Sequence, residues 1–243
     1  METITSVRQT RLAWAVLGLV GTVVCGWAVQ IASARSGSSI LLGAAAYLAA
    51  WIPLLAGLVV CFWGQRLRQA IAALGLRFRP LDLLWGIGIG CVGRAVDAAL
   101  RLALTGSTGL EQQPTLSSIA HLSVIGPTAE TIALGVVAPV LIAPLLEEIY
   151  FRGLIQRGLA EALARLGTIA RWVAAVVLTS TAFAAVHALL LIATPGEATL
   201  AGLSTFVFAL AAGATAAATG RLGGAIVGHV VFNGLGVLLT WPA

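Results

Sequence analysis

Long uncharged stretches separated by short polar segments run through most of the chain. A helix needs about 20 apolar residues to cross the hydrocarbon core of a bilayer, and each of these stretches is long enough. They are residues 12–34, 36–65, 172–196, 198–220 and 222–243. Two further apolar stretches carry charged residues, one over roughly 81–104 and one over roughly 128–147, which ends at two glutamates. The pattern therefore predicts about seven membrane-spanning helices.

The composition supports the same fold class. Of the 243 residues, 59% are hydrophobic and only 9% are charged, and the mean hydropathy is +1.00. A soluble globular domain carries about 25% charged residues. We therefore predict an all-α, polytopic transmembrane helix bundle. Its three cysteines, Cys25, Cys61 and Cys91, lie in apolar stretches and are expected to pack as small residues.

The basic residues, all of them arginine, predict how the bundle is oriented. Counting the seven stretches in chain order, most of the arginines lie before the first, between the second and third, after the fourth, and between the sixth and seventh, whereas the opposite connections hold only Arg35. Connections rich in arginine normally stay in the cytoplasm, so the N-terminus is expected to be cytoplasmic and the C-terminus outside. The net charge of +5 is spread between apolar segments and forms no basic patch, which argues against a nucleic-acid partner.

Three segments need separate interpretation. Residues 148–166 show helical spacing of apolar positions but are too polar to span, which predicts an amphipathic helix lying along the membrane interface. Residues 105–127 are polar and predict a loop. The motif Ala32-Ser33-Ala34 resembles a signal-peptidase site, but the uncharged stretch before it exceeds the roughly 7–15 residues of a signal sequence, so a retained helix is expected.

Glu147 and Glu148 lie at the end of an apolar stretch, where charge is costly. Insertion of an ionisable side chain at membrane depth costs about 2.5–3.5 kcal/mol, so such residues are functional candidates. Arg152 follows Glu148 by four residues, which places both on one helix face and allows an ion pair. That pairing explains Glu148 but leaves Glu147 without a structural reason.

Three other polar residues lie inside apolar stretches. His187 lies in the middle of 172–196, while His229 and Asn233 share one face of the last predicted helix. Taken singly, each fits a packing residue or an interhelical hydrogen bond. Taken together with Glu147, they suit hydrolysis of an amide, because a carboxylate and an imidazole can activate a water, and a second imidazole with a carboxamide can stabilise an oxyanion.

The order of these motifs resembles a known family. The patterns Glu-Glu-x-x-x-Arg, Phe-x-x-x-His and His-x-x-x-Asn, on successive membrane helices, are similar to those of the CAAX protease and bacteriocin-processing family of intramembrane endopeptidases. The resemblance covers about residues 127–240 and implies two parts of one integral domain, 1–126 without a signature and 127–243 as the catalytic core. It implies hydrolysis of a peptide bond near the cytoplasmic surface of what is expected to be a bacterial plasma membrane.

The resemblance also implies roles for the polar residues. Glu147 and His187 would activate water, and His229 and Asn233 would stabilise the oxyanion. Glu148 would orient the site, and Arg152 would pair with a carboxylate or hold the helix. If the enzyme uses a divalent metal such as zinc, Glu147, His187 and His229 would be its ligands; a glutamate mechanism without metal is the other possibility and the one the sequence favours.

The partners implied are a membrane-associated protein or peptide substrate and the lipid bilayer, and the oligomeric state stays open. A non-catalytic immunity or scaffold protein of the same fold is the main alternative. A small transporter would use intramembrane charges as an ion relay, but the internal repeat typical of transporters is not evident. Arg94, Asp97 and Arg101 share one helix face and are expected to pair with each other or to reach toward the membrane surface.

Overall fold

The computed structural model describes residues 2–36, 39–108, 128–190 and 195–240, and these parts of the chain contain helices and short connections without any strand. The separate helices are α1 (Glu2–Ser36), α2 (Ile40–Phe62), α3 (Leu67–Leu74), α4 (Leu81–Thr105), α9 (Thr168–Leu190), α10 (Pro195–Thr219) and α11 (Gly223–Thr240). One composite helix joins α6 (Ala129–Ile132), a π-helical segment (Ala133–Ile142), α7 (Ala143–Glu148), a second π-helical segment (Ile149–Gln156) and α8 (Arg157–Ala162).

The predicted fold class is confirmed. Six helices in the described residues are long and apolar enough to cross a membrane, and α11 contributes a shorter apolar helix, Gly223–Leu239. The protein is therefore an integral, multi-pass membrane protein. The six long helices and α11 together match the predicted number of about seven.

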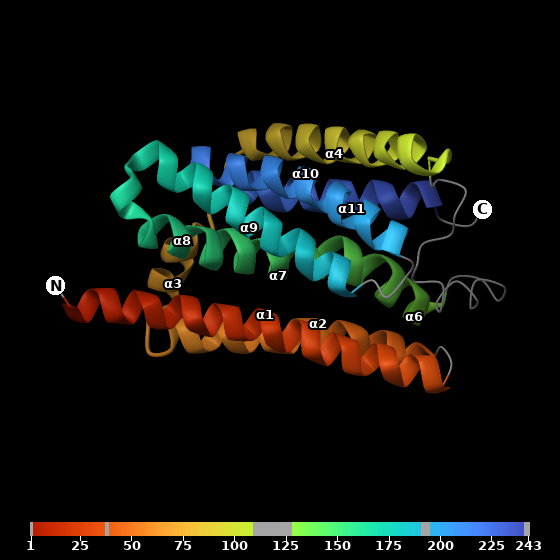
Figure 1. Cartoon of the computed structure of the whole chain (residues 1–243), viewed down its shortest axis with the longest axis horizontal. Coiled ribbons are helices and arrows are strands. Elements are labelled where there is room, and N and C mark those ends of the chain that lie inside the picture. The colour runs from red at the N-terminus through yellow and green to blue at the C-terminus, as the bar shows by residue number, and fades with distance from the viewer. Residues whose placement is uncertain (1, 37–38, 109–127, 191–194, 241–243) are drawn as a thin grey trace.

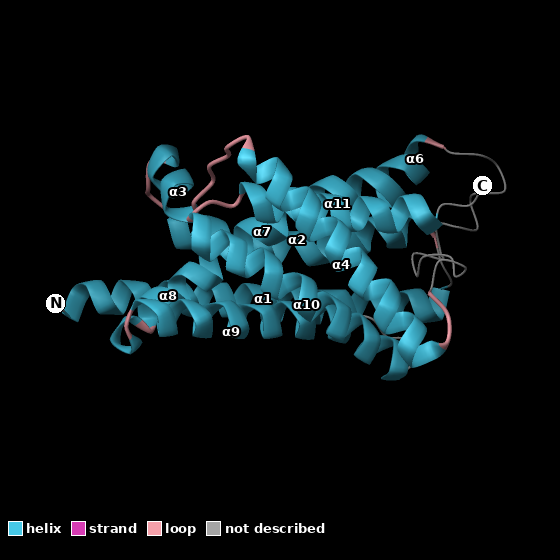
Figure 2. Cartoon of the chain, turned by 90° about the horizontal axis from the view of Figure 1, so that it is seen from above, coloured by secondary structure: helices cyan, strands magenta, loops and turns pink. Residues whose placement is uncertain are grey.

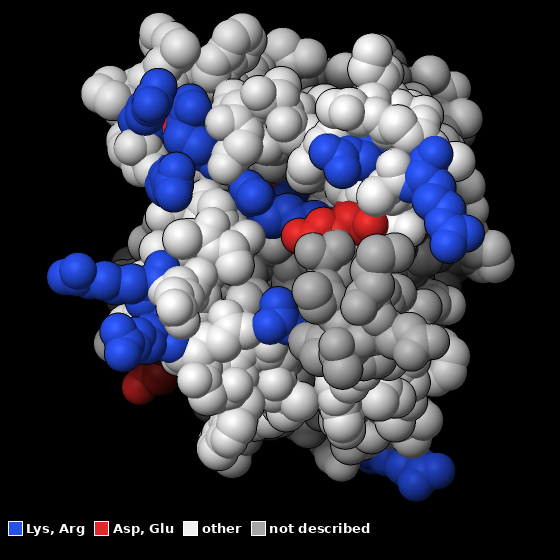
Figure 3. Space-filling model, turned by 90° about the vertical axis from the view of Figure 1, so that its left-hand side faces the viewer, with Lys and Arg blue, Asp and Glu red and all other residues white. Residues whose placement is uncertain are grey.

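The composite helix runs through the middle of the bundle. Figure 1 shows α1 and α2 on one side of it and α4, α10 and α11 on the other, with α9 beside it. The view from above also shows the long helices lying side by side with their axes roughly aligned (Figure 2). Arginine side chains gather at the end of the bundle that holds the start of α1 (Figure 3).

Small residues allow close helix packing where α4 meets α11. A Cβ atom at Gly86 would lie 2.4 Å from the Val227 side chain, and one at Gly90 would lie 2.6 Å from that of Val231. These glycines therefore let two helices approach more closely than side chains would permit, a common device in membrane bundles. This contact fixes α11, and with it His229, against α4.

The composite helix differs from the sequence prediction in one respect. The glutamates were expected to end a span and residues 148–166 to lie along the interface, but the helix continues from Glu148 to Ala162. Residues 150–156 are buried in the bundle. The polar side chains of this segment find their partners inside: Arg152 pairs with Glu148, and Gln156 donates to the carbonyl oxygen of Gly213 at 3.0 Å.

Most of the predicted loop 105–127 lies outside the described residues.

Candidate active site

Two histidines converge on Glu147 in the middle of the bundle. His187 Nε2 and His229 Nε2 each lie 3.8 Å from Glu147 Oε2, and the three residues come from α9, α11 and α7. The side chains are 34% exposed for His187, 18% for Glu147 and 5% for His229. The site is therefore buried on the side of His229 and more exposed on the side of His187.

The hydrogen bonds of the two imidazoles fix which ring nitrogen faces Glu147. His187 Nδ1 lies 2.9 Å from the carbonyl oxygen of Phe183, and because a carbonyl can only accept, Nδ1 carries the hydrogen. His229 Nδ1 lies 2.9 Å from Glu148 Oε1, which also accepts a hydrogen bond from Arg152 Nη1 at 2.9 Å. In the neutral form of each ring, the Nε2 lone pair consequently points toward Glu147.

Three hydrogen-bond acceptors thus face one another. The two Nε2 lone pairs and an ionised Glu147 carboxylate would repel one another, so the arrangement is favourable only with a donor among them. A water molecule can donate to two of these atoms while its own lone pair stays free. The geometry therefore suits a bound and activated water.

Glu148 and Arg152 form a buried ion pair behind His229. Their side chains are 0% and 1% exposed, so neither is solvated by water. Arg152 Nη2 also donates to the carbonyl oxygen of Ala209 at 3.3 Å, and its guanidinium lies 4.4 Å from the centre of the Phe183 ring. The sequence prediction that Arg152 pairs with Glu148 is thus matched by the structure, and the pair in turn orients His229.

Aromatic rings enclose the histidines. The Phe183 ring centre lies 4.3 Å from that of His187 and 5.8 Å from that of His229, and Phe208 lies 5.0 Å from His229. These contacts restrict the rotation of both imidazoles. Phe183 belongs to the Phe-x-x-x-His pattern, whereas nothing in the sequence distinguished Phe208 from other apolar residues.

The hydrogen bond that Asn233 makes is to a backbone carbonyl and not to the three converging side chains. Asn233 Nδ2 donates to the carbonyl oxygen of Pro139 at 2.7 Å, and the described hydrogen bonds include none from Asn233 to Glu147 or to either histidine. Pro139 lies in a π-helical segment, where each carbonyl normally bonds the N–H five residues later. That position is Pro144, which has no N–H, so Asn233 satisfies the carbonyl that Pro144 leaves free.

Tyr47 on α2 likewise bonds a carbonyl that a proline leaves free, five residues earlier in the π-helical segment. Its hydroxyl donates to the carbonyl oxygen of Leu134 at 2.9 Å, and Leu134 is five residues before Pro139, which also lacks an N–H. Sequence reasoning missed Tyr47. The signal that could have found it is the five-residue spacing of the two prolines, but this spacing is informative only once the π-helical register is known.

Arg94, Asp97 and Arg101 pair internally, as the first of the two sequence interpretations expected. Asp97 accepts from Arg94 Nη1 at 2.8 Å, from Arg101 Nε at 3.1 Å and from Ser204 Oγ at 2.6 Å. Arg94 also donates to the carbonyl oxygen of Phe232 at 2.6 Å and lies over its ring. The cluster therefore links α4 and α10 to the part of α11 that carries the site.

The donor atoms suit a divalent metal, but their arrangement fits one poorly. Tetrahedral zinc with bonds of about 2.0–2.1 Å to nitrogen and oxygen brings its ligand atoms to within about 3.4 Å of each other. Here His187 Nε2 and His229 Nε2 each lie 3.8 Å from Glu147 Oε2. Within the part of the chain that the structure describes, no three His, Cys, Asp or Glu side chains are grouped so that they could hold a metal ion.

Comparison with known proteins gives one match. Residues 129–235 match the family described as "Type II CAAX prenyl endopeptidase Rce1-like". This segment contains all six candidate residues, and the match supports the family expected from the sequence motifs. No curated protein and no solved structure matches the chain.

Proposed function

We propose that this protein is an intramembrane endopeptidase that hydrolyses a peptide bond of a membrane-associated protein or peptide. The match of residues 129–235 to the Rce1-like family of type II CAAX prenyl endopeptidases supports this proposal. The single observation that carries the proposal is the convergence of His187 Nε2 and His229 Nε2 on Glu147 Oε2, each at 3.8 Å.

The proposed reaction begins with a water held between these three atoms. Glu147 accepts a proton from the water as its oxygen attacks the carbonyl carbon of the peptide bond, and the carbonyl oxygen becomes an oxyanion. His187, on the open side of the site, shares the water with Glu147. The proton held by Glu147 then passes to the leaving nitrogen as the carbon–nitrogen bond breaks.

The oxyanion needs donors. His229 becomes one when its Nε2 has taken a proton from the surrounding solvent: the imidazolium donates Nε2–H first to the attacking water and then to the oxyanion, while its Nδ1 hydrogen stays on Glu148. Asn233 was expected to assist, but its hydrogen bond to Pro139 supports a structural role instead, and only its second amide hydrogen is free to donate. We therefore assign oxyanion stabilisation to His229.

The test compares Glu147→Gln with Glu130→Gln. Both substitutions remove a carboxylate from the same composite helix, but Glu130 is exposed in its first turn and lies outside the site. Removing a general base costs about 100-fold to 10,000-fold in rate, so Glu147→Gln is expected to abolish measurable cleavage. Purified protein in liposomes would be given farnesylated and unmodified C-terminal peptides, and products identified by mass spectrometry.

Glu130→Gln should cleave at the wild-type rate, and both variants should unfold at the wild-type temperature. Full cleavage by Glu147→Gln would refute the proposed mechanism. If a cellular phenotype of the protein survives in Glu147→Gln, a non-catalytic immunity or scaffold role is the better explanation.

A further inference from the structure

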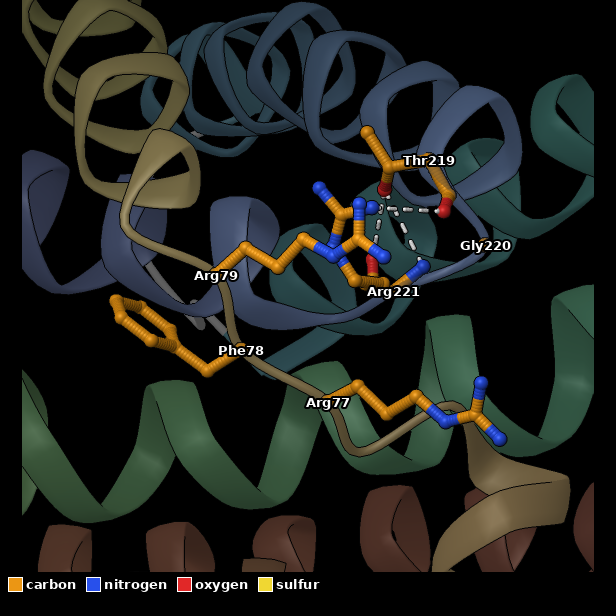
Figure 4. Close-up of a pocket in the computed structure, with 6 residues that line it drawn as sticks. All are labelled: Arg77, Phe78, Arg79, Thr219, Gly220 and Arg221. Carbon is orange, nitrogen blue, oxygen red and sulfur yellow. Dashed lines mark hydrogen bonds between the residues drawn. The ribbon is translucent and has the colours of Figure 1, made fainter.

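A second polar site lies at the arginine-rich end of the bundle. The connection from α3 to α4 meets the turn between α10 and α11, where the Leu222 N–H donates to the carbonyl oxygen of Gly75 at 3.0 Å. The two segments enclose a pocket of about 560 Å³ (Figure 4). Its lining residues are Arg77, Phe78, Arg79, Thr219, Gly220 and Arg221.

The pocket is built on a buried carboxylate. Asp82 is fully buried and accepts from Arg221 Nη2 at 2.7 Å and Nε at 3.2 Å, a two-point contact that fixes the guanidinium. Asp82 also accepts from the backbone N–H of Arg79 at 2.8 Å. One carboxylate therefore holds both walls of the pocket in place.

The charges of the pocket do not balance. Asp82 neutralises Arg221, whereas the side chains of Arg77 and Arg79 are exposed and form no ion pair within the described residues. In Figure 4 the Arg79 side chain extends toward Arg221 and Thr219. A fourth arginine, Arg157, donates to the carbonyl oxygen of Gly220 at 2.8 Å and interacts with the carboxylate of Glu161. Guanidinium groups gathered in this way repel one another unless an anion lies between them.

The surroundings of the pocket indicate what kind of anion. It lies at the first turn of α4, a candidate membrane-spanning helix, which is where the membrane surface is expected. Next to it, Phe78, Leu81, Leu84 and Trp85 are 52–69% exposed and face outward. Aromatic residues at a helix end are typical of the membrane interface. A ligand here would contact arginines with a polar group and apolar side chains with the remainder of the molecule.

We propose that this pocket binds the phosphate group of an anionic phospholipid, with Arg77 and Arg79 as its main ligands and the acyl chains along the apolar start of α4. Arginine presents paired N–H donors that match phosphate oxygens. The pocket volume lies within the range of about 300–1,000 Å³ that small-ligand sites occupy. The site shares no residue with the proposed active site, so it stands independently of the protease function.

The test uses native mass spectrometry of the full-length protein in detergent, with phosphatidylglycerol and phosphatidylcholine as probes. We expect selective retention of phosphatidylglycerol. A basic residue near an anionic headgroup contributes about fivefold in affinity, so Arg77→Gln and Arg79→Gln should each lower retention about fivefold and the double variant by more. Arg221 is left intact because its removal would leave Asp82 buried without its partner.

The matched control is Arg68→Gln, which removes an exposed arginine from α3 at the same end of the bundle but outside the pocket. It should retain phosphatidylglycerol like the wild type, and all variants should keep the wild-type unfolding temperature. Equal retention of the two lipids, or an equal loss in Arg68→Gln, would overturn the proposal in favour of diffuse surface attraction. Displacement of the lipid by an equal concentration of inorganic phosphate would overturn the lipid assignment and indicate a free phosphate as the ligand.

Discussion

At the residue scale, the two adjacent glutamates have different environments and different expected roles. Glu147 is 18% exposed and faces the lone pairs of two histidines, whereas Glu148 is fully buried and bonded to Arg152 and His229. We therefore expect Glu148, whose charge has two fixed partners, to stabilise the structure, and Glu147, which faces two imidazole lone pairs, to take part in the reaction. This contrast can be tested by making the same change at both positions.

Glu148→Gln is expected to destabilise the protein strongly. Removing one partner of a buried ion pair costs about 3–5 kcal/mol because the other charge, here Arg152, stays buried without compensation. Unfolding in detergent, followed by circular dichroism or by a thiol-reactive dye, would measure this. Glu147→Gln should change the unfolding temperature little while abolishing cleavage. Similar stability losses in both variants would contradict this division of roles.

At the element scale, the composite helix depends on side chains from its neighbours. Pro139 in the π-helical segment and Pro144 in the first turn of α7 have no N–H, and the carbonyls left free are bonded by Tyr47 from α2 and Asn233 from α11. An unsatisfied carbonyl inside a membrane bundle is costly, because no water is available to bond it. The prolines therefore tie the helix that carries Glu147 to the helices on both of its sides.

A double-mutant cycle tests this role for Asn233. Asn233→Leu should destabilise the wild type by about 1–3 kcal/mol, the cost of a buried acceptor without a donor. In a Pro144→Ala background the new N–H at position 144 can bond the Pro139 carbonyl, so the same substitution should cost much less. Unfolding free energies of the four proteins give the coupling directly.

The same four proteins separate a structural role from a catalytic one. If Asn233 acts mainly through the Pro139 carbonyl, Pro144→Ala should restore much of the cleavage lost in Asn233→Leu. An equal loss of cleavage in both backgrounds, with stability restored, would instead identify Asn233 as an oxyanion donor. Tyr47→Phe combined with Pro139→Ala repeats the design on the other side of the helix.

At the scale of the whole molecule, the sequence predicted what depends on composition and spacing. Long apolar stretches are sufficient to predict spanning helices. The three sequence motifs were sufficient to predict that Glu147, His187 and His229 lie close together. The path of residues 148–166 could not be predicted in this way. Their polarity suggested the membrane surface, but it is satisfied internally by Glu148 and by the Gly213 carbonyl, contacts that require knowledge of the tertiary packing.

The placement of Asn233 was unpredictable for a related reason. The sequence shows that His229 and Asn233 share a helix face, but not that a proline on another helix leaves a carbonyl without its donor. Only the π-helical register of Ala133–Ile142 creates that need. The arginine pocket likewise joins Arg77 and Arg79 to Arg221, which is distant in sequence. The two segments are held together by Asp82 and by the hydrogen bond from Leu222 to Gly75, contacts that the sequence does not show.

The orientation of the bundle is the remaining prediction at this scale. The starts of α1, α4 and α11 and the connection from α8 to α9 lie at the arginine-rich end, which the positive-inside rule assigns to the cytoplasm. Single cysteines at Arg68 and Thr105 mark the two ends, in a background where Cys25, Cys61 and Cys91 are replaced by alanine. A membrane-impermeant maleimide should label Thr105→Cys in intact cells and Arg68→Cys only after permeabilisation.

The labelling result also bears on the lipid site. If Arg68→Cys is labelled in intact cells and Thr105→Cys is not, the orientation is reversed and the arginine pocket faces the outer leaflet. Anionic lipids are concentrated on the cytoplasmic side of most plasma membranes, so the predicted orientation places the pocket in the leaflet that is rich in its proposed ligand. Orientation and lipid selectivity are measured separately, and agreement between them would support one placement of this protein in its membrane.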